Sequence, residues 1–254
     1  MMITVNADDF GWSQSCSKAI MSAFDQHLIQ TTTMICNGAY FEEAVDLLEG
    51  SALKDHVGIH FDLTEGCPLT EAIKTDPFFC GTDGLFHMHV NRYAALNREQ
   101  KRNAYEELKA QAKRFREKGL AFHHADSHHH IHTAPNIFPI VVQVMKEFEI
   151  GKMRISRNIG SMSLPKKLLK TGFNTVLKLQ KLDYTDFFGS PSELSETPLN
   201  RKNATVEFMV HPDFDKTGML IDRFGDSSYE DPVGDKLSDL LEVMNERGDS
   251  LLSW

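Results

Sequence analysis

The sequence lacks a long hydrophobic run, paired cysteines and an excess of positive charge. No apolar stretch in its 254 residues approaches the ~20 residues that a membrane-spanning helix needs, and the apolar residues 1–5 are too few for a signal peptide. The four cysteines form no CxxC pair, which favours separate thiols in a reducing compartment over disulfides. The formal net charge of -9 argues against a nucleic-acid partner. We therefore expect a cytoplasmic protein with neither a membrane nor a nucleic acid as partner.

A dinucleotide-binding loop is also absent, because no GxGxxG motif follows the first apolar segment. What is present is an alternation of strand-like and helix-like patterns. Apolar and β-branched runs predict strands over residues 1–5, 31–36, 57–61, 122–125, 153–155, 184–188 and 204–210. Apolar spacing of three and four residues predicts helices over residues 13–27, 41–48, 97–118, 137–148, 164–182 and 235–246. The helix over 164–182 is expected to be interrupted at Gly172.

This alternation predicts an α/β fold. Because no internal linker divides the chain, we expect a single domain over residues 1–254. The expected architecture is an irregular (β/α) barrel, TIM-barrel-like, with seven or eight βα units. Residues 62–90 are rich in glycine and proline and predict a long loop after the strand over 57–61. Loops of that length are uncommon and often functional, so this one is expected to border the site.

The segment from His123 to His132 concentrates side chains that bind metals. It holds six of the twelve histidines and one carboxylate, Asp126. Neutral imidazole is the commonest side-chain metal ligand, and it needs a carboxylate or carbonyl partner to fix its tautomer. The segment therefore predicts a metal centre, with a solvated histidine-rich loop as the alternative. If the segment is extended, a period of two places Asp126, His128, His130 and His132 on one side.

Further polar groups follow the strand patterns near the start of the chain. Asp8 and Asp9 follow residues 1–5, and His60 lies within residues 57–61. In α/β folds the reactive groups gather at the carboxyl ends of the strands, where the βα loops open. Two adjacent carboxylates cannot face one point, so one can ligate a metal while the other accepts a proton from water. The alternative is a helix N-cap, although Ser13 already offers one.

These groups predict a ligand set of two imidazoles and one carboxylate. Such a set leaves positions open for water and substrate, as catalytic metal sites require. We expect Asp126 outside the set, where it accepts an N–H from an imidazole. His211 ends the strand over 204–210 and is either a proton donor to an amine leaving group or a structural residue. Arg154 is either a substrate clamp or part of a buried ion pair.

Four segments together resemble the YdjC-like carbohydrate deacetylases, which include the chitooligosaccharide deacetylase. The segments are Asn6-Ala7-Asp8-Asp9-Phe10-Gly11, Gly58-Ile59-His60-Phe61-Asp62-Leu63-Thr64, His124 to His132 and Val210-His211-Pro212. They occur in the family's order and span nearly the whole chain. The resemblance implies an irregular (β/α) barrel and one divalent metal ion. It also implies removal of an acetyl group from an N-acetylated oligosaccharide, such as N,N′-diacetylchitobiose.

The resemblance further implies roles for single residues. Asp9, His60 and His128 match the metal ligands, Asp8 matches the catalytic base, and His211 matches the general acid. For His211, the match favours the role of general acid over the structural role that its sequence context alone favours.

Several points stay open at this level. Asp126, His130 and Arg154 are candidates for contacts with substrate or with the metal ligands. The family often has Arg-x-Pro-Arg where this chain has Arg154-Ile155-Ser156-Arg157, and residues 160–200 show no match. The expected metal is Mg or Zn. The sequence leaves open whether the protein forms a homodimer. The alternative functions are a sugar-binding or regulatory module that retains the metal, and a metal phosphoesterase on a similar barrel.

Overall fold

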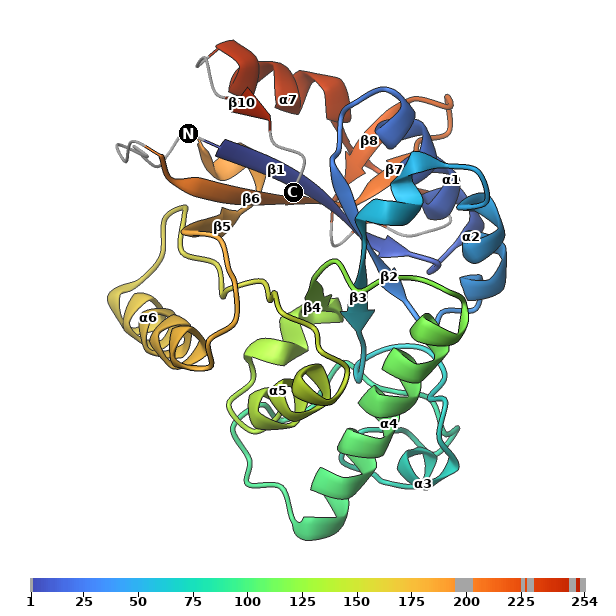
Figure 1. Ribbon diagram of the computed structural model, residues 1–254, viewed down its shortest axis with the longest axis vertical. Helices are drawn as coiled ribbons and strands as arrows, with labels where there is room; N and C mark the ends of the chain where they lie inside the picture. Colours follow the sequence, from blue (N-terminus) through green and yellow to red (C-terminus); the bar gives the residue numbers. More distant parts are fainter. Residues whose placement is uncertain (1, 195–202, 225–226, 228–230, 247–249, 252–254) are drawn as a thin grey trace.

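Six parallel strands form a curled sheet in the order β4–β3–β2–β1–β6–β5 (Figure 1). The computed structural model describes residues 2–194, 203–224, 227, 231–246 and 250–251. The strands are β1 (Met2–Phe10), β2 (Thr31–Ile35), β3 (Val57–Phe61), β4 (Ala125–Ser127), β5 (Phe187–Gly189) and β6 (Thr205–Val210). A short strand, β10 (Ser250–Leu251), pairs in parallel with the start of β1. The chain thus forms a single α/β domain around this sheet.

The alternation of residues along β1 explains how the sheet carries both a core and a site. Ile3, Val5 and Ala7 are fully buried in the apolar core. The residues between them are polar, and Asn6 donates a hydrogen bond to the Asp8 carboxylate at 2.8 Å. Successive side chains of a strand point to opposite faces. One face of β1 therefore packs in the apolar core while the other joins a buried polar network.

The helices follow the strands along the chain, and α1, α2, α4 and α5 lie around the outside of the sheet (Figure 1). Their bounds are α1 (Gln14–Asp25), α2 (Phe41–Leu47), α3 (Glu71–Lys74), α4 (Arg98–Glu117), α5 (Phe138–Glu147), α6 (Leu164–Leu179) and α7 (Leu237–Glu246). Short 3-10 segments are η1 (Ala52–His56), η2 (His128–Thr133) and η3 (Pro191–Leu194). In the described part of the chain, every helix is too short or too polar to cross a bilayer.

Local signals placed several of these helices correctly. Ser13 caps α1 by accepting a hydrogen bond from the Cys16 backbone N–H at 3.0 Å, as predicted. Asn97 and Gln100 form a reciprocal capping box at the start of α4. Gly172, by contrast, does not interrupt α6, which continues to Leu179. A glycine inside a helix costs only about 1 kcal/mol relative to alanine, which the other residues of α6 offset.

The C-terminal part departs from the predicted alternation. After β6, the strands β7 (Pro212–Phe214), β8 (Leu220–Arg223) and β9 (Gly234–Lys236) form a separate antiparallel sheet. Residues 153–155 form no regular strand, because Met153 makes only an isolated bridge to Ala125. A barrel of seven or eight βα units is therefore not confirmed by the described residues. An antiparallel hairpin, β7–β8, begins just after His211, and a period-based prediction cannot detect it.

The histidine segment is also not extended as predicted. Strand β4 covers Ala125–Ser127 instead of residues 122–125, and the chain then enters η2. His129 and His130 have φ angles of 48° and 53°, in the left-handed region. The expected alternation of Asp126, His128, His130 and His132 on one side is therefore wrong, since the turn reorients each ring separately.

Candidate active site

A cavity of about 430 Å³ opens at the carboxyl edge of the sheet. Among the predicted residues, it is lined by Asp8, Asp9, His60, His128, His130 and His211. Strands β1, β3 and β6 and the turn η2 bring them to this edge. In the register of β3 and β4, His60 lies opposite Asp126. Segments far apart in the sequence thus meet as the parallel topology requires.

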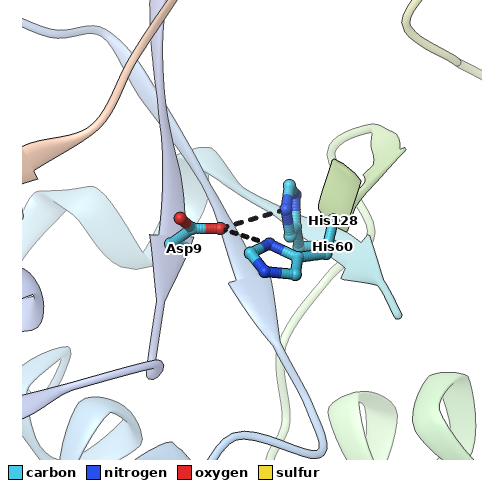
Figure 2. Close-up of side chains that lie close together, drawn as sticks. All are labelled: Asp9, His60 and His128. Atoms are coloured by element: carbon cyan, nitrogen blue, oxygen red, sulfur yellow. Dashed lines mark hydrogen bonds and ion pairs between the residues drawn. The ribbon is translucent and has the colours of Figure 1, made fainter. Parts of the chain in front are cut away.

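Asp9 and two imidazoles form the centre of the site (Figure 2). Asp9 Oδ1 lies 2.9 Å from His128 Nδ1 and 3.2 Å from His60 Nε2. One ligand atom from each of these residues lies within 4.8 Å of the others. Asp9 has a φ angle of 72°, a conformation that few residues other than glycine adopt. This local reversal at the end of β1 separates the direction of Asp9 from that of Asp8.

Each imidazole is also held from its other side by a second carboxylate. His60 Nδ1 lies 2.6 Å from Asp126 Oδ1, and His128 Nε2 lies 3.1 Å from Glu65 Oε2. The Trp12 ring stacks on His128 with centroids 5.3 Å apart. Metal-binding histidines almost always have such a partner on the nitrogen that does not face the metal. The arrangement orients both rings toward Asp9.

The charges around these rings favour a cation. Burial alone would lower the pKa of His60, but Asp126 and Asp9 outweigh it and raise that pKa to about 10. Burial likewise opposes protonation of His128, yet Asp9 and Glu65 raise its pKa well above the usual value. Two imidazoles and one carboxylate, buried and already oriented, are a donor set that fits a divalent metal with open positions. The residues present therefore fit the predicted group.

A second cluster lies beside the first and surrounds Arg154. The guanidinium donates to both oxygens of Asp8, at 2.6 and 2.7 Å, and to Glu207 at 2.6 Å. It also lies 2.7 Å from Asp126 Oδ2. Burial raises the pKa of Asp8, but the charge and hydrogen bonds of Arg154 outweigh burial and hold it well below the usual range. Of the two alternatives for Arg154, the structure shows the buried ion pair.

Asp126 joins the two clusters. One carboxylate oxygen contacts His60, and the other accepts a hydrogen bond from Thr33 at 3.0 Å and contacts Arg154. It lies outside the triad of Asp9, His60 and His128, as expected for a residue that orients a ligand. Asp126 therefore links the orientation of the His60 ring to the Arg154 cluster.

His130 and His211 line the cavity without belonging to either cluster. Burial, and then the charge of Arg154, keep the pKa of His130 well below its usual value, so this ring is neutral. Within the described residues, its buried Nδ1 has no hydrogen-bond partner. His211 follows β6 directly, and its Nδ1 lies 4.0 Å from Asp222 Oδ1. Asp222, in strand β8, also accepts a hydrogen bond from the His211 backbone N–H at 2.7 Å, which fixes the start of the β7–β8 hairpin.

Three charged residues of the site were missed from the sequence. Glu65 lies only five residues after His60, and its proximity was a usable signal. Glu207 interrupts an otherwise apolar strand, so its charge also pointed to a buried partner. Arg223, whose Nη2 lies 3.9 Å from Asp9 Oδ2, comes from the antiparallel sheet. Nothing local in the sequence indicated it, since that sheet was not predicted.

Comparisons with known proteins agree with the resemblance seen in the sequence. The family model of the YdjC-like proteins matches residues 2–243. A carbohydrate deacetylase of Brevibacillus brevis is 32% identical over 84% of this chain and 81% of its own length. A chitooligosaccharide deacetylase of Salmonella paratyphi B is 32% identical over 84% of this chain and 82% of its own. The match to a carbohydrate deacetylase of Geobacillus stearothermophilus, 37% identical, covers 58% of this chain but only 56% of that protein.

A likeness to a solved structure supports the fold. A protein of Enterococcus faecalis V583, provisionally described as a cellobiose-phosphate cleavage protein, superposes with a TM-score of 0.72. The superposition covers 99% of this chain and 96% of that one at 19% identity, which supports the fold alone. Deacetylases are hydrolytic enzymes, so the relatives' names confirm the prediction of an enzyme. From the match over residues 2–243, this chain belongs to the YdjC-like protein family.

Proposed function

We propose that this protein is a metal-dependent hydrolase that removes an acetyl group from N-acetylated amino sugars. The expected substrates are chitooligosaccharides such as N,N′-diacetylchitobiose. One observation carries the proposal: the triad of Asp9, His60 and His128 lies beside the ionised Asp8 on one cavity. The names of the relatives support the substrate class.

Asp9, His60 and His128 would hold one divalent metal, Mg or Zn. When bound, it would polarise the acetamide carbonyl and lower the pKa of a nearby water. The protein's own contribution is orientation, since Asp126 and Glu65 fix the imidazoles before any ligand arrives. Two nitrogen donors favour Zn over Mg, whereas one carboxylate suits either.

Asp8 is the proposed base that accepts the proton of the attacking water. It lines the cavity, and Arg154 keeps its carboxylate ionised and oriented. A carboxylate held in this way is ready to accept a proton, although Arg154 also weakens its basicity. The fixed orientation offsets that loss, because a base must lie within hydrogen-bond reach of the proton it removes.

His211 is the proposed acid that protonates the departing amine. It lies on the cavity at the end of β6, and its Nδ1 lies 4.0 Å from the Asp222 carboxylate. His130, which lines the cavity, is proposed to contact the substrate. Arg154 and Asp126 are proposed to act through their neighbours, without touching the sugar.

We also propose that residues 1–254 form one deacetylase domain. Its core is the curled sheet, and not the (β/α) barrel of seven or eight units that was expected. We further propose a cytoplasmic location and a homodimeric state.

The test is acetate release from N,N′-diacetylchitobiose by the purified protein, with and without a chelator. We expect release that stops on chelation and returns when Zn or Mg is restored singly. If the untreated protein binds acetylated sugars but releases no acetate from several of them, the sugar-binding module replaces the enzyme.

A further inference from the structure

The turn that follows β4 has an unusual backbone. His129 and His130, with φ angles of 48° and 53°, are consecutive residues in the left-handed region. Residues with a Cβ adopt that region reluctantly, and then mostly singly. Such backbone persists only where the surrounding structure determines it. His128 immediately precedes this pair, so the direction of its ring depends on what holds the turn.

Arg92 holds the outer side of the turn. Its Nη2 donates a hydrogen bond to the His129 carbonyl at 2.6 Å, and its Nη1 donates to the His130 carbonyl at 3.4 Å. Both contacts are to the backbone of the two left-handed residues. The planar guanidinium presents several N–H groups in a fixed geometry, which suits two neighbouring carbonyls. Arg92 lies in the long excursion between β3 and α4, two residues beyond the loop 62–90 that was expected to border the site.

The start of the same excursion contacts the turn from another direction. Thr64 Oγ1 lies 3.0 Å from His129 Nδ1, and Glu65 Oε2 lies 3.1 Å from His128 Nε2. Within the turn itself, Thr133 Oγ1 donates to the His130 carbonyl at 2.9 Å. The excursion therefore contacts both the side chains and the carbonyls of the turn.

We propose that Arg92 is a positioning residue that clamps the left-handed turn and thereby aims His128 at Asp9. This inference rests on the proposed function and deepens it. It assigns part of the excursion to orienting the proposed metal ligand His128, and not to contacting the substrate. Arg92 does not touch the reacting atoms. Its effect passes through two carbonyls to the ring of His128.

The first experiment uses the metal-free protein and needs no activity. Hydrogen–deuterium exchange is compared in the wild type, Arg92→Ala and Arg102→Ala. Arg102 is the matched control, since it is an exposed arginine on α4 that, among the described residues, forms an ion pair only with Glu99, at 3.8 Å. In Arg92→Ala, exchange over residues 128–133 should rise roughly tenfold, as expected for losing a charge-assisted hydrogen bond. Arg102→Ala should leave that segment unchanged.

The second experiment measures the dissociation constant for Zn²⁺ in the same variants. Arg92→Ala should raise it by about 10- to 100-fold, the usual effect of losing an orienting partner of a ligand. Adding His129→Gly to Arg92→Ala should recover part of the affinity, because glycine adopts a positive φ without strain. A merely structural arginine would not give recovery through that backbone position.

Unchanged exchange over residues 128–133, or Zn²⁺ affinity within twofold of wild type, would overturn the proposal. If Arg92→Ala does not fold, Arg92→Lys decides, because lysine keeps the charge but cannot span both carbonyls in one plane. It should give a smaller effect of the same sign, and a wild-type result would count against the clamp. Faster exchange in a protein that releases no acetate would reject the proposed function while leaving the clamp intact.

Discussion

The two clusters at the carboxyl edge of the sheet share neighbours but are built in opposite ways. Around Arg154, the three carboxylates of Asp8, Asp126 and Glu207 surround one cation. Around Asp9, imidazoles surround one carboxylate. The first cluster already contains its cation, a guanidinium that cannot leave. The second has donors that are oriented toward a common point and is suited to take up a metal ion.

This difference separates the roles of two adjacent residues of the same type. The carboxylate of Asp8 is occupied by Arg154 on both oxygens, so it is oriented and ionised but poorly placed to bind a metal. Asp9, after the reversal of φ at the end of β1, faces the rings. In the proposed function, environment and not residue type therefore assigns one aspartate to proton transfer and the other to metal binding. The predictions below test this division.

The largest effect is expected from removing the cation of the first cluster. Arg154→Ala would leave three buried carboxylates without their partner. Breaking a buried ion pair from one side costs about 3–5 kcal/mol in the free energy of unfolding. Urea denaturation of Arg154→Ala, with Arg102→Ala as the exposed control, measures this loss. A change below about 1 kcal/mol, the range of surface ion pairs, would show that the cluster is not a structural unit.

A comparable effect, on rate instead of stability, is expected for Asp8→Asn. Asparagine keeps the size of the side chain but cannot accept the proton of the attacking water. The kcat for acetate release should fall by at least about 10² while the metal content stays at the wild-type level. Near wild-type turnover in this variant would remove Asp8 from the role of base.

The change His211→Ala tests the proposed acid. Loss of the proton donor should lower kcat about 10²-fold for an amino-sugar substrate. The loss should be smaller for an activated acetamide, whose amine leaves without protonation. Equal losses on the two substrates would indicate that His211 is a structural residue between β6 and β7.

The smallest effect concerns the residue shared by both clusters. Asp126→Asn should weaken Zn²⁺ binding by about 10- to 100-fold, because the His60 ring loses the charged partner that orients it. Isothermal titration of the variant and of the wild type gives the ratio. Unchanged affinity would mean that Asp126 serves only the Arg154 cluster.

The parts of this arrangement that the sequence revealed are those governed by local rules. Strands β2 and β3, the cap at Ser13 and the helix that follows Asn97 agree with residue patterns within a few positions. The meeting of Asp9, His60 and His128 followed from the rule that parallel strands share a carboxyl edge, joined to the family resemblance. Both kinds of inference need no knowledge of distant contacts.

The parts that were not predictable depend on contacts between distant segments. The turn at His129 and His130 is held by Thr64 and Arg92, which lie many positions earlier in the chain. Likewise, Arg223 reaches Asp9 only because an antiparallel sheet follows β6. Periodicity reports which face of an element is buried, and carries no information on such long-range pairs.

The most direct test of the account is metal analysis of four proteins purified alike: wild type, Asp8→Asn, Asp9→Ala and His60→Ala. The account predicts about one divalent ion per chain in the wild type and in Asp8→Asn. It predicts loss of that ion, with the fold retained by circular dichroism, in Asp9→Ala and His60→Ala. Full metal occupancy in His60→Ala, or loss of the metal in Asp8→Asn, would contradict the assignment of the two clusters.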